Sequence, residues 1–176
     1  ALGIGTPDLV EGLAQGRSGI GPIGSFDVSK CRCTRAGLVA PFDWRPHARR
    51  LDLRSMVDVS RFATLAAREA LESAGLPLRP AALADTGLVL ATYTGPPEEA
   101  LMERVWSTPD HIPDLAAFAE SVPNSINGNV TKTLYLKGYN TMEATGRQGG
   151  VGALILASRA ISRGHSPRII AGSADP

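Results

Sequence analysis

Residues 140–157 read NTMEATGRQGGVGALILA, and this stretch decides the fold. Asn140–Thr145 has the length of a short strand, and Gly149–Ser162 has the length and composition of a helix. Between residues 151 and 157 that helix is apolar on every side, and no charge appears before Arg159. Such a helix must be covered on every side, whereas a single sheet covers only one face. We therefore expect a second sheet or a second chain on the other face.

The segments on both sides of this stretch alternate in the same way. Thr86–Tyr93 (TGLVLATY) is a nearly continuous apolar run, which is typical of a central parallel strand. Arg168–Ala171 (RIIA) predicts another strand, and Ser60–Ala74 and Ser125–Leu136 predict helices. Strands that alternate with helices indicate an α/β fold with a mostly parallel sheet and helices on both faces. At 176 residues, the chain is expected to form a single domain.

Two predictions concern particular residues of these elements. Ala1–Ile4 is expected to be a short buried strand. Thr6, which precedes Pro7 and Asp8, is expected to cap a helix that ends near Gly16. In the helix at 60–74, the core side is expected to carry Phe62, Ala63, Ala66, Ala67, Ala70 and Ala74.

The charge of the chain is small but unevenly distributed. The net charge of +1 gives no general attraction to nucleic acid or membrane, and neither is expected as a partner. Residues 24–58 show no sustained periodicity and are predicted to be a long loop. Within it, seven basic residues stand against two acidic ones between Lys30 and Arg54.

Cysteine and histidine usage excludes other classes of protein. Cys31 and Cys33 are too few for a secreted disulfide scaffold, and their C-x-C spacing strains a disulfide. His47, His111 and His165 are not spaced as metal ligands, so no metal site is expected. The sequence contains no apolar run of about 18 residues and no visible signal peptide. A cytoplasmic protein is the expectation.

Several short motifs follow one another along the chain. They are GRSGI at 16–20, FD at 26–27, RF with AAREAL and AGL between 61 and 76, PN at 123–124, LKG at 136–138 and RIIAGS at 168–173. Together they resemble the N-terminal half of the β-ketoacyl synthases of the thiolase superfamily. The resemblance covers nearly the whole chain and implies a thiolase-like fold without a cofactor.

The resemblance breaks at the family's nucleophile. Active synthases carry a cysteine in the pattern T-A-C-A-S-G, at a turn from strand to helix that we call the elbow. This sequence has TGRQGG at 145–150, so Arg147 stands at the position of the cysteine. A guanidinium is not nucleophilic, so no catalytic residue is predicted. A register shifted by one residue would place Gln148 there, as in chain length factors and decarboxylating loading domains.

The position also carries an electrostatic conflict. The start of a helix favours negative charge, so a permanent cation there is disfavoured unless an acid answers it. We expect Glu143 or a second chain to supply that acid.

The family's two catalytic histidines lie in its C-terminal half and match none of the three histidines here. The resemblance therefore implies a catalytically silent, chain-length-factor-like subunit. It would form a heterodimer with a full-length, cysteine-bearing ketosynthase of fatty-acid or polyketide biosynthesis. The implied partner interface comprises Ser125, Asn129, Asn140, Met142 and Glu143, and the implied acyl-tunnel residues are Met102, Trp106 and Phe118.

Two alternatives remain open. With Gln148 at the elbow, the chain would be a malonyl-decarboxylating enzyme that obtains its histidines from elsewhere. Alternatively, it would be a binding module for acyl carrier protein, which is acidic. The docking residues would then be Arg45, Arg49 and Arg50 of the basic loop.

Overall fold

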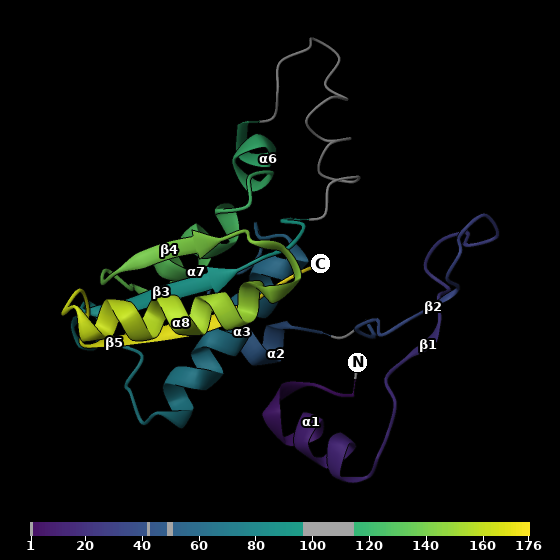
Figure 1. The fold of residues 1–176 in the computed structure, drawn as a ribbon, viewed down its shortest axis with the longest axis horizontal. Helices are drawn as coiled ribbons and strands as arrows, with labels where there is room; N and C mark the ends of the chain where they lie inside the picture. Colours follow the sequence, from purple (N-terminus) through teal and green to yellow (C-terminus); the bar gives the residue numbers. More distant parts are fainter. Residues whose placement is uncertain (1, 42, 49–50, 97–114) are drawn as a thin grey trace. The chain divides into compact units, whose positions relative to one another are not determined.

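The computed structural model describes residues 2–41, 43–48, 51–96 and 115–176 (Figure 1). The chain divides into two compact units, residues 1–47 and 48–176, and each is described by itself. None of the helices in the described ranges is long and apolar enough to span a membrane.

The first unit contains one longer helix and a small ladder. Helix α1 spans Gly5–Ala14, and strand β1 (Gly21–Pro22) pairs antiparallel with β2 (Arg35–Ala36). Helix α2 (Arg45–Ala48) spans the boundary between the units. Gly12 is the only buried residue among the described residues of this unit.

Two predictions for the N-terminus are wrong. Residues 2–4 form no strand, and Ile4 is 43% exposed. Ile4, not Thr6, occupies the N-cap of α1, and no side chain caps the helix end there. The Ile4 amide instead donates to Asp8 Oδ2 at 2.8 Å, so the acid of the first turn accepts a hydrogen bond from the N-cap residue of the helix.

A parallel three-stranded sheet organises the second unit. Strand β3 (Thr86–Ala91) lies between β4 (Asn140–Glu143) and β5 (Arg168–Ser173). All six residues of β3 are buried, as the apolar run predicts. The predicted α/β fold, with a parallel sheet and helices on both faces, is confirmed.

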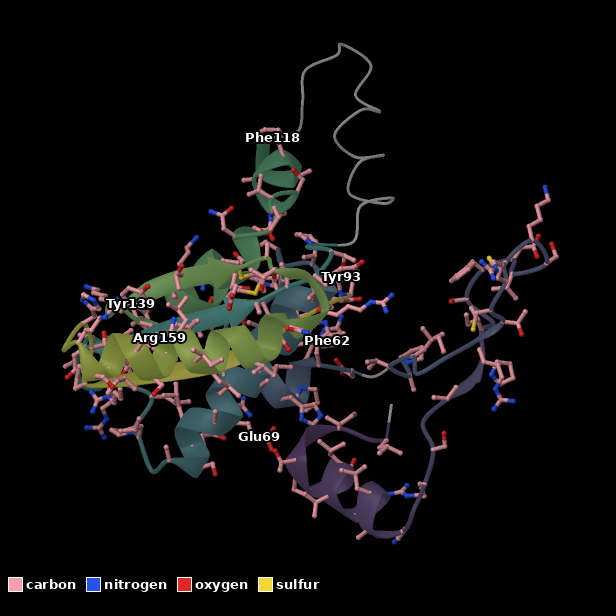
Figure 2. The ribbon with its side chains drawn as sticks, in the orientation of Figure 1. Phe62, Glu69, Tyr93, Phe118, Tyr139 and Arg159 are labelled. Carbon is pink, nitrogen blue, oxygen red and sulfur yellow. The ribbon has the colours of Figure 1, made fainter. Side chains whose placement is uncertain are left out.

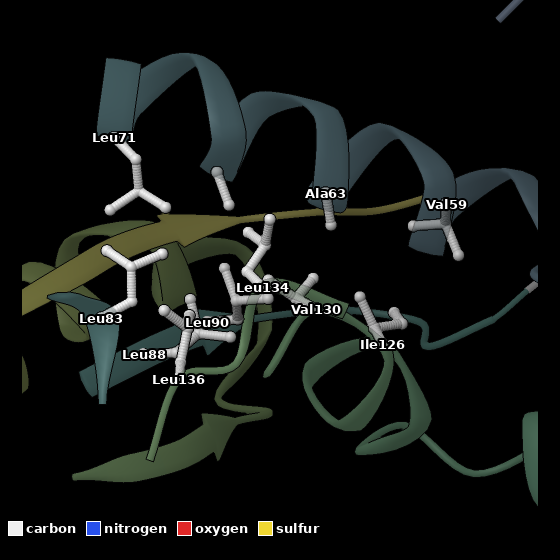
Figure 3. Close-up of a cluster of buried hydrophobic side chains, with 11 residues drawn as sticks. Val59, Ala63, Leu71, Leu83, Leu88, Leu90, Ile126, Val130, Leu134 and Leu136 are labelled. Atoms are coloured by element: carbon white, nitrogen blue, oxygen red, sulfur yellow. The ribbon is translucent and has the colours of Figure 1, made fainter. Parts of the chain in front are cut away.

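The two faces of β3 carry two separate clusters of buried side chains. On one face, Leu88 and Leu90 pack against α3 (Asp58–Ser73) and α7 (Ser125–Leu134), as Figure 3 shows. On the other face, Val89 and Ala91 pack against α8 (Gly149–Ser162). Side chains alternate along a strand, so one six-residue segment anchors helices on both sides. The described part of the unit also contains three shorter helices, α4 (Pro80–Leu83), α6 (Leu115–Glu120) and η1 (Gly146–Gln148).

The core side of α3 differs from the prediction. Ala66, Ala70 and Ala74 are exposed, whereas Arg68 is buried and its Nε lies 3.5 Å from Glu72 Oε1. Alanine is small and tolerated on either side of a helix, so the larger side chains decide which face turns inward. The residues of α3 that the fold buries are Val59, Ser60, Ala63, Thr64, Ala67, Arg68 and Leu71.

Helix α8 is apolar all round, but the sheet covers only one of its sides. Ala153, Ala157 and Ala160 are buried. Val151 is 62% exposed and Leu154 is 58% exposed on the outer side. The described residues therefore leave the outer face of α8 open, as the sequence predicts.

Asp175, just after β5, holds the loop that follows β3. Its Oδ1 accepts hydrogen bonds from Thr92 Oγ1 (2.8 Å), Tyr93 N (2.7 Å) and Thr94 N (3.2 Å). Thr92 Oγ1 in turn accepts from Gly95 N at 3.0 Å. Burial alone would raise the pKa of Asp175, but these hydrogen bonds outweigh it and hold the pKa below its ordinary value.

Asp175→Ala is expected to lower the free energy of unfolding by about 1 kcal/mol at pH 7, because three donors lose a charged acceptor. A carboxylate with a lowered folded pKa stabilises the fold above its unfolded pKa of about 3.9, and this stabilisation disappears as pH falls through the folded value. The difference between wild type and Asp175→Ala should therefore shrink below about pH 4. Urea denaturation at pH 7 and pH 3 measures it, with the surface variant Asp43→Asn as control. An equal difference at both pH values would contradict this account.

Candidate functional site

The carboxyl ends of the three parallel strands meet at the elbow, where open α/β sheets place their ligands. Strand β4 ends at Glu143, η1 follows at Gly146–Gln148, and α8 begins at Gly149. Gly146 has a φ of 80°, which a glycine adopts without strain. A Cβ on Gly149 would lie 2.9 Å from the Cβ of Ala91, so glycine allows the first turn of α8 to approach β3 closely.

Arg147 is exposed in η1 at this turn. No side chain caps the start of α8, so its first amide groups carry the positive end of the helix dipole beside the guanidinium. Among the described residues, no ion pair joins Arg147 to Glu143, so the expectation that Glu143 answers this charge is wrong within the chain. Gln148, the alternative elbow residue, is also exposed and occupies the N-cap position of α8.

Glu143 turns toward α8 instead. Its Oε1 accepts a hydrogen bond from Thr145 Oγ1 at 3.2 Å. Its Oε2 is buried and has no hydrogen-bond partner among the described residues. A Cβ on Gly152 would lie 2.5 Å from this oxygen, so the absence of a side chain at Gly152 makes room for the carboxylate.

Sequence reasoning missed the loop that borders the elbow. Tyr93 is 57% exposed, and its ring lies 3.6 Å from the point where a Cβ on Gly146 would be. Figure 2 labels it beside the strand ends. Asp175 fixes the backbone of this loop. The sequence did contain a signal, since polar residues follow both β3 and β5. The ends of adjacent parallel strands meet at one edge of the sheet, so these residues are expected to lie close together.

The predicted interface residues fall into two groups. On α7, Ser125 Oγ donates to Glu120 O at 3.0 Å, and Asn129 Nδ2 donates to Ser60 Oγ (3.2 Å) and Glu120 Oε2 (2.8 Å). These two side chains make hydrogen bonds inside the chain and hold α6 against α7. On β4, Asn140 is exposed, whereas Met142 is half-buried and packs on the cluster beneath α3.

The other predicted sites are only partly described. Met102 and Trp106 lie outside the described residues, as do Arg49 and Arg50. Phe118 is 56% exposed on α6 and projects from it in Figure 2.

Arg45 is exposed at the start of α2. It lies 3.5 Å from Asp43 Oδ1, and its guanidinium stands 5.8 Å from the ring centroid of Trp44. Of the predicted site residues that the structure describes, Arg147, Gln148 and Glu143 lie at or beside the elbow.

The two thiols do not lie at the elbow, and the possible metal ligands of the described residues do not cluster. Cys31 and Cys33 are exposed free thiols of the first unit. Across the described ranges, no three His, Cys, Asp or Glu side chains gather into a metal site. The chemical groups at the elbow are thus a guanidinium, an amide, a carboxylate and a phenol.

Curated relatives resemble the chain over most of its length. It is 28% identical to the 3-oxoacyl-[acyl-carrier-protein] synthase 2 of Synechocystis, over 96% of this chain and 41% of the relative. It is also 28% identical to the oxytetracycline polyketide putative β-ketoacyl synthase 1 of Streptomyces rimosus, over 98% of this chain and 42% of the relative. The chain thus spans about two fifths of these relatives.

Solved structures share the fold. The ishigamide ketosynthase/chain length factor superposes with a TM-score of 0.80 at 22% identity, covering 98% of this chain and 44% of that one. A β-ketoacyl synthase from Burkholderia phymatum gives a TM-score of 0.67 at 21% identity, covering 94% and 42%. The AntDE:AntF complex, a ketosynthase with its acyl carrier protein, gives 0.61 at 15% identity, covering 88% and 41%.

The family model for the N-terminal domain of β-ketoacyl synthases matches residues 1–175. The ketosynthase neighbours confirm the thiolase-like fold. This chain belongs to the β-ketoacyl synthase family, as an N-terminal domain with arginine at the elbow.

Proposed function

We propose that this chain is a ketosynthase-like subunit without condensing activity of its own, which pairs with a cysteine-bearing synthase in fatty-acid or polyketide synthesis. One observation carries the proposal: the elbow presents the exposed guanidinium of Arg147. Condensation by a thioester route needs a thiolate there, and the only cysteines of the sequence are Cys31 and Cys33.

The relatives support this role through what their names say. One structural neighbour is a ketosynthase/chain length factor, and another is a ketosynthase in complex with its acyl carrier protein. The curated relatives are a 3-oxoacyl-[acyl-carrier-protein] synthase and a polyketide synthase component. A ketosynthase and an acyl carrier protein are therefore the partners we propose, and the cytoplasm is the proposed location.

The outer edge of β4 supports pairing with another chain. Leu88 N donates to Tyr139 O at 2.8 Å, and Thr92 N donates to Glu143 O at 2.9 Å, so these carbonyls point toward β3. Backbone groups alternate along a strand, so those of Asn140 and Met142 point away from β3. Among the described strands none pairs with this edge, which is a template for a strand from a partner.

Substitution at the elbow tests the missing nucleophile. Wild-type protein is incubated with acyl carrier protein that carries a radiolabelled acyl group, and it is expected to acquire no label. Arg147→Cys is expected to become acylated, because the start of α8 lowers the pKa of a thiol placed there. Arg159→Cys, at an exposed position of α8, is the matched control and should stay unlabelled. Acylation and chain elongation by the unaccompanied wild type would contradict the proposal.

Pairing can be tested at the β4 edge. Co-expressed with a full-length cysteine-bearing ketosynthase from the same genome, the wild type is expected to co-purify with it. Asn140→Pro removes an outward N–H and should weaken that association at least tenfold, about 1.4 kcal/mol. Asn140→Ala, which keeps the N–H, should bind like wild type. Calorimetry measures the affinities, and melting curves confirm folding. A wild type that stays monomeric beside the synthase would overturn the pairing.

Carrier-protein docking has a specific observation behind it, the exposed Arg45 at the start of α2 in the basic segment. The triple variant Arg45→Glu, Arg49→Glu, Arg50→Glu is expected to weaken binding of acyl carrier protein and to flatten its dependence on salt concentration. Arg79→Glu, an exposed arginine outside the loop, is the control. If the triple variant binds acyl carrier protein as tightly as the control does, these arginines take no part in docking.

A further inference from the structure

The ring of Tyr93 lies against the backbone of the elbow. Tyr93 follows the end of β3 by two residues, and Figure 2 labels it beside the strand ends. Its Cε2 and Cδ2 atoms lie 3.6 and 3.7 Å from the point where a Cβ on Gly146 would be, which is ordinary van der Waals distance. Gly146 opens η1 and directly precedes Arg147. The ring therefore takes up space on one side of the residue that leads into the position of the family's nucleophile.

The backbone that carries Tyr93 is tied to both neighbouring strands. Thr92 N donates to Glu143 O at 2.9 Å, on the side of β4. Tyr93 N and Thr94 N donate to Asp175 Oδ1 at 2.7 and 3.2 Å, on the side of β5. Because hydrogen bonds hold the main chain both before and after the Cα atom of Tyr93, the ring can leave the elbow only by rotation of its own side chain.

The ring is not part of the hydrophobic core. Tyr93 exposes more than half of its surface, and it belongs to neither of the two clusters of buried side chains that flank β3. Its hydroxyl makes no hydrogen bond to any residue that the structure describes. A tyrosine that supports a fold usually buries its ring and pairs its hydroxyl. Removal of this ring is therefore expected to leave the fold intact, so its effect falls on the elbow.

We infer that Tyr93 is a second obstacle to acylation at the elbow, besides the missing thiol, and that it excludes long acyl chains. The inference rests on the proposed function, because it gives a further cause of the same catalytic silence. An acyl carrier protein reaches the elbow from solvent, where the exposed ring lies next to the turn. An acyl group held at position 147 is attached one residue away from Gly146, so a long chain competes with the ring for space, and an acetyl group competes less.

A purely structural role for the ring predicts the opposite effect. If contact with Tyr93 only steadied the turn at Gly146, removal of the ring would loosen the elbow and slow any chemistry at position 147. If the ring is an obstacle, its removal speeds acylation, and the gain is larger for a long chain than for an acetyl group. The direction of the change and its dependence on chain length therefore distinguish the two roles.

The test uses the full chain in the Arg147→Cys background, with acyl carrier protein that carries either a labelled acetyl or a labelled palmitoyl group. The thiolate at position 147 attacks the thioester carbonyl, a new carbon–sulfur bond replaces the bond to the carrier, and the carrier leaves as its thiolate. Adding Tyr93→Ala should raise the palmitoyl rate by about tenfold or more, and the acetyl rate by less. Tyr93→Phe, which keeps the ring, should leave both rates unchanged. Tyr135→Ala, at another exposed tyrosine, is the matched control, and melting curves confirm folding.

The outcomes separate the inference from the proposed function. If Tyr93→Ala leaves both rates of the Arg147→Cys variant unchanged, or lowers them, the inference fails and the proposed function stands. The inference also fails if neither variant takes up a palmitoyl group, because the ring is then not what excludes it. Acylation and chain elongation by the unaccompanied wild type, with Arg147 and Tyr93 in place, would overturn both.

Discussion

Burial of β3 on both faces is the constraint on which the rest of the second unit depends. Its six residues are all buried, and each face holds a different layer of helices. A fully buried leucine such as Leu88 contributes about 2 kcal/mol through removal of its apolar surface from water. Both described neighbours of β3 run parallel to it, so the carboxyl ends of the three strands lie at the same edge of the sheet. The elbow lies where it does for that reason.

The backbone of the elbow and its chemistry are separable. Gly146 adopts a positive φ, and Gly149 allows α8 to approach β3 closely. Both requirements hold whatever residue stands at position 147. The turn from β4 into α8 therefore forms in this chain although it carries Arg147 and Gln148 and no cysteine. This pattern is consistent with a fold kept for assembly rather than for thioester chemistry, and it is the physical basis of the proposed role.

Two features of the second unit lack cover or a hydrogen-bond donor among the described residues. The outer side of α8 exposes Val151 and Leu154, and the end of β4 buries a carboxylate oxygen that has no donor in the described ranges. Exposed apolar surface becomes favourable once another chain or layer covers it, whereas a buried charged oxygen becomes favourable only when a donor or an opposite charge pairs with it. The first unit has a related property, since only Gly12 is buried among its described residues.

The sequence by itself determined the α/β class, the central strand at 86–91, the helix at 149–162 and the absence of a cysteine at the elbow. These follow from local periodicity and residue identity, which need no knowledge of distant contacts. The inward face of α3 and the failure of residues 2–4 to form a strand were decided by tertiary structure. So were the position of Asp175 on the Tyr93 loop and the approach of the Glu143 carboxylate to Gly152. Each depends on which segments the parallel sheet brings together, and residues more than 80 positions apart, such as Tyr93 and Asp175, meet only when the strands between them have paired.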